Sequence, residues 1–343
     1  MSKKITTLFV LLLIASLALT ACGSKDNNAA VVEDVPEVVV DPVKVCQVTD
    51  VGGIDDKSFN ATAWKGVEDA EAAFDVEGSF LESQQQTDYA TNINAFIEEE
   101  CDLIITVGFL LGDATAAAAE ANPDQKFAII DVNYLAFDNL MGLDFAIDQA
   151  GFLAGYVAAA NTVTGVVGTF GGINIPPVTA FMDGYAYGVA YFNEENGTAV
   201  EVLGWNPETQ EGLFTGNFES ADDGRAMGET LMDEGADVIM PVAGPVGLGT
   251  AAAIQERGGA WIVGVDNDWT LSNPEYADIV LTSVLKNMDA GVFDTTEEVV
   301  GMICVEDVYT TILVVSKRGY GKRTYLNDPE DKEPVYRITN RGG

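Results

Sequence analysis

Residues 43–60 read VKVCQVTDVGGIDDKSFN and predict a strand, a turn and the start of a helix. Val43–Asp50 is apolar and rich in valine, which is typical of a buried strand. Two glycines then supply the turn, and Ser58 stands at the N-cap of a helix expected over Ser58–Phe74. The helix N-terminus would point into a crevice at the strand end, so the segment predicts the first βα unit of an open sheet.

The same alternation of a short apolar run and an amphipathic stretch repeats along the chain. The other expected strands are Phe80–Ser83, Leu103–Gly108, Phe127–Asp131, Leu140–Asp144, Val166–Gly171, Ala199–Gly204, Asp237–Val242, Trp261–Asp266 and Ile279–Leu285. The other expected helices are Tyr89–Glu99, Ala114–Ala121, Gln149–Asn161, Val178–Asn193, Asp222–Asp233 and Leu248–Gln255. This order predicts an α/β protein with parallel sheets covered on both faces. Ten strands in two sets predict two domains, with a boundary near Asp148.

The charge balance excludes several classes of function. The chain has 343 residues, 54 acidic and 17 basic, no histidine, and a net charge of −37. Such a surface repels phosphate, which argues against nucleic acid as a partner. The lack of histidine removes every Ser-His, Cys-His and His-metal mechanism. We therefore expect no catalytic residues, no metal and no cofactor.

The N-terminus predicts export and lipid anchoring. Lys3 and Lys4 precede an apolar run over Ile5–Leu19, which is too short to span a membrane comfortably and is typical of a signal peptide. Small residues then precede Cys22, as in a bacterial lipobox, so residues 1–21 would be removed and Cys22 acylated, for example with palmitate. Residues 22–43 have the composition of a flexible tether. The mature protein is then expected on the extracytoplasmic face of the cell membrane.

The remaining cysteines are Cys46, Cys101 and Cys304. They lie in apolar runs at irregular spacing, and three thiols define no even-numbered disulfide framework. We expect them to be small buried apolar side chains.

A glycine pattern in the second half has an alternative reading. Residues 247–252 match G-x-G-x-x-A at a helix start, and Asp266 ends the next strand, where a dinucleotide-binding enzyme places its ribose-binding acid. Four residues, 243–246, separate the expected strand from Gly247, where the fingerprint requires a tight turn. An NAD-using enzyme is therefore the less favoured reading, although such a loop still allows a ligand to approach the backbone.

Asp50–Asn60 and six later blocks, in order, resemble the basic membrane protein family of substrate-binding lipoproteins, which includes the purine nucleoside receptors of ABC transporters. The blocks are Phe127–Asp131 (FAIID), Gln149–Ala158 (QAGFLAGYVA), Gly171–Gly184 (GGINIPPVTAFMDG), Gly235–Gly244 (GADVIMPVAG), Trp261–Asp268 (WIVGVDND) and Leu281–Lys286 (LTSVLK). The resemblance implies two Rossmann-like lobes of the type I periplasmic-binding-protein fold, joined by a hinge. The lobes would comprise residues 44–148 with about 287–308, and residues 149–286.

The resemblance also implies a ligand and partners. A monomeric receptor would bind inosine, guanosine or adenosine between its lobes and deliver it to separate ABC permease and ATPase subunits. Three alternatives stay open: a receptor for another small solute, a surface adhesin or antigen on the same fold, and an enzyme that uses a nucleoside or NAD.

Ten ligand-binding residues follow from the resemblance. Phe59 and Phe218 would stack on the base, although Phe214 lies one turn from Phe218. Asp50 and Asp131 would read base or sugar edges, and Asp266 would accept the ribose hydroxyls. Lys286 would bind the sugar or pair with Asp266. The remaining four are Gly244 and Gly247, which would allow backbone approach, and Asn60 and Phe109.

The C-terminal region departs from the family pattern. The family ends with a glycine-rich strand and an amphipathic helix, and Met302–Gly343 has neither. Residues 317–343 carry a net charge of +3, against −40 for residues 1–316. Residues 309–343 therefore form an atypical tail that reflects a reading-frame change, a truncation or divergence, and translating the other frames of the gene distinguishes these.

Overall fold

The computed structural model describes residues 41–300, 311–315 and 321–325. The predicted signal peptide, the acylation site Cys22 and most of the tether lie outside the described residues, as do Cys304 and most of the tail. The two short segments beyond residue 300, β13 (Thr311–Val315) and β14 (Gly321–Tyr325), form an antiparallel pair.

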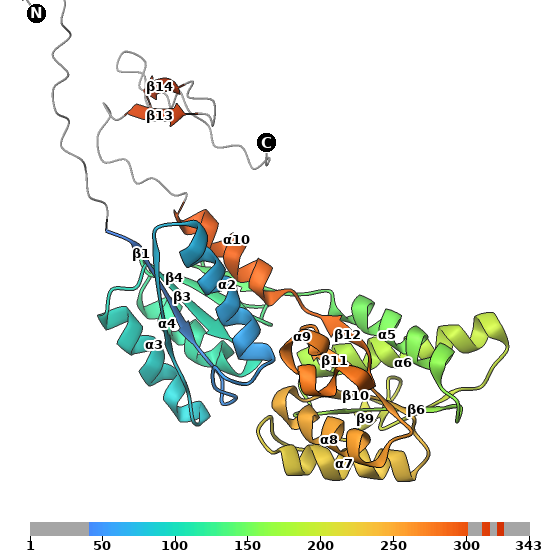
Figure 1. Ribbon diagram of the computed structural model, residues 1–343. Helices are drawn as coiled ribbons and strands as arrows, with labels where there is room; N and C mark the ends of the chain where they lie inside the picture. The colour runs from blue at the N-terminus through green and yellow to red at the C-terminus, as the bar shows by residue number, and fades with distance from the viewer. Residues whose placement is uncertain (1–40, 301–310, 316–320, 326–343) are drawn as a thin grey trace, which may run out of the picture. The chain divides into compact units, whose positions relative to one another are not determined.

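The first half of the chain forms a five-stranded parallel sheet in the order β2-β1-β3-β4-β5. Its strands are β1 (Val43–Val48), β2 (Val76–Leu81), β3 (Leu103–Val107), β4 (Lys126–Ile130) and β5 (Leu140–Leu143). The helices that pack with it are α2 (Phe59–Ala73), α3 (Tyr89–Glu98), α4 (Gly112–Ala121) and α10 (Met288–Val300), and the short helices η1 (Gln86–Asp88) and η2 (Phe109–Leu111) precede α3 and α4. These elements form the first lobe (Figure 1).

The second half forms another five-stranded parallel sheet, in the order β12-β11-β10-β6-β7. Its strands are β6 (Val166–Gly171), β7 (Glu201–Leu203), β10 (Val238–Val242), β11 (Trp261–Asp266) and β12 (Val280–Leu285). Its helices are α5 (Ile147–Asn161), α6 (Pro176–Asn196), α7 (Ala221–Asp233), α8 (Gly247–Arg257) and α9 (Trp269–Ser272), with η3 (Gly244–Val246) and η4 (Pro274–Ile279). A small hairpin joins β8 (Trp205–Asn206) to β9 (Glu211–Gly212). These elements form the second lobe, and both sheets follow the 2-1-3-4-5 order of flavodoxin-like folds.

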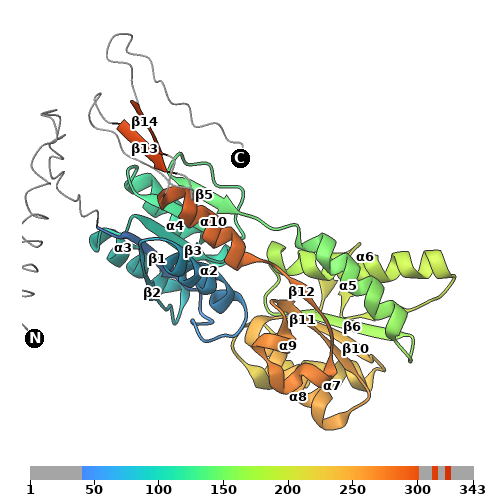
Figure 2. The same ribbon diagram turned by 45° about the horizontal axis from the view of Figure 1, so that its top comes forward.

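Both faces of the first sheet carry an apolar core. On one face, Ala63 and Val67 of α2 pack with Met288 and Val292 of α10. The other core is built from α3, α4 and the sheet, and includes Ile93. Figure 2 shows α10 beside α2, although the two helices are more than 200 residues apart in the chain. The chain thus leaves the first lobe after β5 and returns to it through α10, while the exact residue limits of the two domains stay a prediction.

The predicted fold class is confirmed, and the differences concern the bounds of some elements and a few elements that were not expected. The strand expected at Phe80–Ser83 begins earlier, at Val76, because the polar residues of this half-exposed edge strand hide its start. The strand expected at Ala199–Gly204 is reduced to Glu201–Leu203. Helix α10 was not expected, because its acidic sequence has only a weak amphipathic pattern. Its apolar residues become recognisable as a buried face only once the helix is seen to pack on α2.

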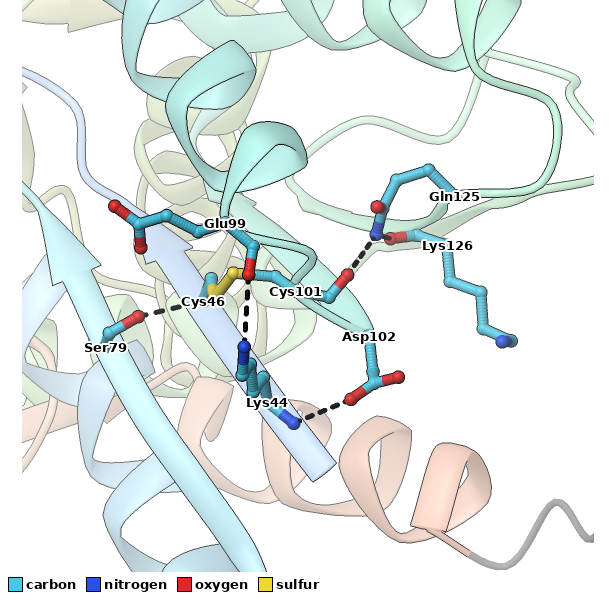
Figure 3. The surroundings of a disulfide bond; sticks show 8 residues. All are labelled: Lys44, Cys46, Ser79, Glu99, Cys101, Asp102, Gln125 and Lys126. Atoms are coloured by element: carbon cyan, nitrogen blue, oxygen red, sulfur yellow. Dashed lines mark hydrogen bonds between the residues drawn. A yellow bond between two sulfur atoms is a disulfide. The ribbon is translucent and has the colours of Figure 1, made fainter. Parts of the chain in front are cut away.

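The expectation of free buried cysteines was wrong for two of them. Cys46 of β1 and Cys101, in the turn before β3, form a disulfide with their Cα atoms 6.2 Å apart (Figure 3). The two residues are separated by 55 positions and are both buried, 1% and 4% exposed. Sequence spacing could not reveal the pair, because it is the parallel pairing of β1 with β3 that brings the two cysteines together.

Candidate functional site

A cavity opens at the carboxyl ends of the strands of both sheets. Its walls come from the segments that end or follow β1, β3, β4, β6, β9, β10, β11 and β12 and from the first turns of α2 and α6. The lining residues are Asp50, Gly52, Asp56, Phe59, Gly108, Phe109, Leu110, Asp131, Ile175, Pro177, Val178, Phe181, Phe218, Val242, Ala243, Gly244, Pro245, Val265, Asp266 and Lys286. Open α/β sheets bind ligands at this edge, so this cavity is the candidate site.

Eight of the ten residues expected at the site line this cavity, and two do not. Asn60 is fully buried behind the wall, where it donates a hydrogen bond to the Asp50 carboxylate. Gly247 begins α8 inside the second lobe, where a Cβ would lie 2.9 Å from Pro241 Cγ and 3.0 Å from Trp269 Cη2. The small size of Gly247 therefore serves helix packing, and of these two predicted glycines only Gly244 lines the cavity.

The N-terminus of α2 is held by an aspartate rather than by the expected serine. Asp56 accepts hydrogen bonds from the backbone N–H groups of Ser58, Asn60 and Ala61 at 2.9, 2.8 and 3.0 Å. Ser58 makes no side-chain cap bond, and its hydroxyl donates instead to Asp266 Oδ2 of the second lobe at 2.7 Å. Burial raises the pKa of Asp56 to about 6.

Asp50 follows β1 and is 8% exposed. Its Oδ1 accepts from Asn60 Nδ2 at 2.7 Å and from the Gly52 N–H at 3.0 Å. Burial raises the pKa of Asp50, and these two hydrogen bonds oppose the rise. Gly108 lies beside both Asp50 and Phe59: a Cβ at Gly108 would lie 3.3 Å from Phe59 Cε1 and 3.5 Å from Asp50 Oδ2, and its φ of +115° favours glycine.

The single lysine of the cavity pairs with an aspartate of the other lobe. Lys286, after β12, lies 2.6 Å from Asp131 Oδ1 and 2.7 Å from Oδ2, with both side chains less than a tenth exposed. We expected Lys286 to bind sugar or pair with Asp266. It pairs instead with Asp131, because the loops after β12 and β4 meet across the cavity. The ammonium also lies 4.8 Å from the Phe59 ring centre, a cation–π distance.

Asp266 ends β11 and is 7% exposed. Its backbone φ is +70°, and that of Asp131, after β4, is +69°. Aspartate tolerates this left-handed conformation better than most residues, and its cost is accepted mainly at functional sites. Burial raises the pKa of Asp266, while the charge of Lys286 and the hydrogen bond from Ser58 lower it.

Aromatic side chains line the cavity from both lobes. Phe218 is among them, whereas Phe214 packs edge-to-face on Trp205 with ring centres 5.9 Å apart, which resolves the ambiguity between the two. Phe109 packs edge-to-face on Tyr134 in the first lobe. Sequence reasoning missed Phe181, one turn after the Pro176–Pro177 start of α6, although that helix start was a visible signal.

Two further contacts join the lobes beside the cavity. Asn267 Nδ2 donates to the Lys57 carbonyl and to Thr62 Oγ1, both at 3.0 Å. Lys57 forms an exposed ion pair with Glu275 at 3.3 Å.

Within the described part of the chain, no group of three or more His, Cys, Asp or Glu side chains is placed so that it could hold a metal ion. The cavity combines four carboxylates with one lysine. Such a site offers many hydrogen-bond acceptors and apolar surface, and its charge is unfavourable for phosphate.

Comparison with known proteins agrees with this geometry. Residues 43–303 match the family model Bmp, described as ABC transporter substrate-binding protein PnrA-like. The "CD4+ T-cell-stimulating antigen" of Listeria innocua is 30% identical over 312 residues, which cover 86% of this chain and 83% of that protein. The "ABC transporter nucleoside-binding protein BmpA" of Lactococcus lactis is 27% identical over 315 residues, covering 87% and 85%. An ABC transporter solute-binding protein from Aeropyrum pernix aligns with a TM-score of 0.68 at 30% identity, covering 76% of this chain and 71% of that one.

Two parallel sheets with a cavity at their strand ends, together with these matches, define a substrate-binding protein of an ABC transporter. The chain belongs to the Bmp family of PnrA-like substrate-binding proteins. Within the described residues, none of the helices is both long and apolar enough to cross a membrane.

Proposed function

We propose that this protein binds a purine nucleoside between its two lobes and delivers it to separate permease subunits, without making or breaking a bond. The observation that carries the proposal is a cavity in which aromatic rings and buried strand-end carboxylates come from both lobes. A ligand that contacts both lobes stabilises the form in which they meet, which is how such a receptor responds to its ligand.

The chemistry of the lining fits an uncharged, flat ligand with hydroxyl groups. Aromatic rings stack on a base, a contact worth about 1–3 kcal/mol per base in nucleic-acid complexes. An ionised carboxylate only accepts hydrogen bonds, so the aspartates suit ribose O–H and purine N–H donors. With four carboxylates against Lys286, a phosphate group would meet net repulsion.

Each lining group then has a role. Phe59 and Phe218 stack on the two faces of the base. Asp50 accepts from its edge, and Asp266 accepts from the ribose hydroxyls. Lys286 neutralises Asp131 and donates to the sugar. The name of the Lactococcus lactis relative, a nucleoside-binding protein, supports this choice over another small solute.

Calorimetry with a panel of nucleosides, bases, sugars and amino acids tests the ligand. We expect at least one purine nucleoside to bind well below a Kd of ~100 μM, which is weak for a dedicated receptor. If every nucleoside fails at that concentration and a sugar or amino acid binds, the fold is retained and the ligand class is wrong. Release of free base or ribose from inosine by the pure protein would favour an enzyme instead.

We further propose that the mature chain is anchored at Cys22 on the extracytoplasmic face of the membrane. The Cys46–Cys101 disulfide supports export, because disulfides persist in oxidising compartments. Metabolic labelling with palmitate should mark the wild-type protein and leave Cys22→Ser unlabelled. Labelling of Cys22→Ser equal to wild type would refute this anchor.

A further inference from the structure

Behind the first-lobe wall of the cavity, one amide joins two carboxylates. Asn60 Nδ2 donates to Asp50 Oδ1 at 2.7 Å and to Asp56 Oδ2 at 3.2 Å. Asn60 Oδ1 in turn accepts from the Asp50 backbone N–H at 3.3 Å. Both N–H donors of the amide are therefore used, and its fully buried position excludes water as a substitute partner.

At one end of this series of hydrogen bonds, Asp56 is bonded to the backbone of helix α2. The Asp56 carboxylate accepts three backbone N–H groups at the start of α2, which satisfies donors that a helix N-terminus leaves free. From the other side, Gln47 of β1 donates to the Asn60 carbonyl at 3.2 Å. Strand and helix together therefore determine where the Asn60 amide lies.

At the other end of the series, Asp50 keeps one carboxylate oxygen for a ligand. Oδ1 is occupied by Asn60 and by the Gly52 N–H. Among residues 41–300, Oδ2 receives no hydrogen bond, and Asp50 lines the cavity. Because the bonds to Oδ1 restrict rotation of the carboxylate, Oδ2 is presented in one direction.

We infer that Asp56 and Asn60 are positioning residues that hold Asp50 with Oδ2 facing the cavity as the acceptor for an N–H or O–H group of the ligand. This inference rests on the proposed nucleoside-binding function. Asp56 also lines the cavity, so the competing possibility is that it contacts the ligand directly. The two possibilities differ in whether the effect of Asp56 depends on Asp50.

A double-mutant cycle separates them, with inosine binding measured by calorimetry on the wild type, Asp56→Asn, Asp50→Asn and the double variant. We expect Asp56→Asn to weaken binding about tenfold, because a charged hydrogen-bond partner is lost. If Asp56 acts through Asp50, the same change in the Asp50→Asn background should alter affinity less than about twofold. A tenfold loss in both backgrounds would indicate direct contact and would overturn the inference.

Asp55→Asn is the matched control, since Asp55 is the adjacent, exposed aspartate. It should change affinity less than about twofold. Asn60→Ala provides a second route if Asp56→Asn folds poorly, and it should show the same dependence on Asp50. A wild type that binds no nucleoside refutes the proposed function, whereas normal wild-type binding with an additive cycle refutes only the positioning role.

Discussion

The two lobes have the same strand order, and β4 of the first corresponds to β11 of the second. Asp131 follows β4 and Asp266 ends β11, and both aspartates have a φ near +70°. The partners of these two aspartates differ. Asp131 of the first lobe pairs with the ammonium of Lys286, whereas Asp266 of the second lobe accepts from the hydroxyl of Ser58. In both cases the partner belongs to the other lobe.

This difference shows that a repeated backbone does not produce a repeated site. Each lobe supplies a strand-end carboxylate, and the group that contacts this carboxylate directly belongs to the opposite lobe. Asp131 forms an ion pair with the ammonium of Lys286, whereas Asp266 accepts a hydrogen bond from an uncharged hydroxyl and is influenced by the charge of Lys286. The lobes are therefore similar in fold and unequal in electrostatics.

The largest expected effect is at the pair that joins the lobes. Lys286→Met should weaken nucleoside binding by about 2–5 kcal/mol, because the buried Asp131 carboxylate loses its partner where the lobes meet. Calorimetry measures the change. Asp131→Asn combined with Lys286→Met should recover part of the loss, and an equal loss in the double variant would show that the unpaired charge is not its cause.

The next effect is a loss of stability that we expect in the first lobe and not in the second. The Cys46–Cys101 disulfide closes a separation of 55 residues within the first lobe. Its removal by Cys46→Ala with Cys101→Ala should lower that lobe's unfolding free energy by about 4 kcal/mol. Amide hydrogen exchange should then speed up across β1 and β3 and stay unchanged across β6 and β10. Equal acceleration in both sheets would mean that the lobes unfold as one unit.

A pH effect should also arise in the first lobe. The pKa of Asp56 is about 6 in the folded protein against an ordinary value of 3.8, so the folded state holds this proton more tightly. The contribution of Asp56 to the free energy of unfolding, about 3 kcal/mol, is therefore fully present below pH 4 and is lost as the pH rises to about 6. Urea unfolding at several pH values should show a flatter profile for Asp56→Asn, and parallel profiles would contradict the assignment.

In the second lobe, Asp266→Ala should weaken nucleoside affinity by about 2 kcal/mol, since it leaves polar ribose groups and the Ser58 hydroxyl without their acceptor. Ser58→Ala is the companion variant, because it removes the cross-lobe bond and keeps the carboxylate. If Ser58→Ala has the full effect of Asp266→Ala, the aspartate acts between lobes and not on the ligand.

The smallest effect is expected at the exposed cross-lobe pair of Lys57 and Glu275. Both side chains are about half exposed, 52% and 49%, so solvent and salt screen the pair. Glu275→Gln should change nucleoside affinity less than about twofold. A large, salt-sensitive loss would show that the surface pair, and not the buried one, dominates contact between the lobes.

Much of the fold could be predicted from local pattern. Buried parallel strands such as β3 are apolar throughout, so their position is plain in the sequence, whereas the edge strand β2 begins with alternating polar residues and was placed too late. Strand ends and family resemblance placed Asp50, Asp131, Asp266 and Lys286 together, and all four line the cavity, while their contacts with a ligand stay a prediction. The role of Asp56 was missed, because an aspartate pair in so acidic a chain resembles any solvated surface.

The sequence alone determined the alternation of strands and helices, the carboxylates at strand ends and the unusual charge, since these depend on neighbours along the chain. Only the tertiary structure decided which groups meet. It joined Cys46 to Cys101, directed Lys286 to Asp131 instead of Asp266, and turned Ser58 from a helix cap into a contact between lobes. The physical reason is that a pair's energy depends on distance and burial, and both arise only when segments far apart in the chain pack together.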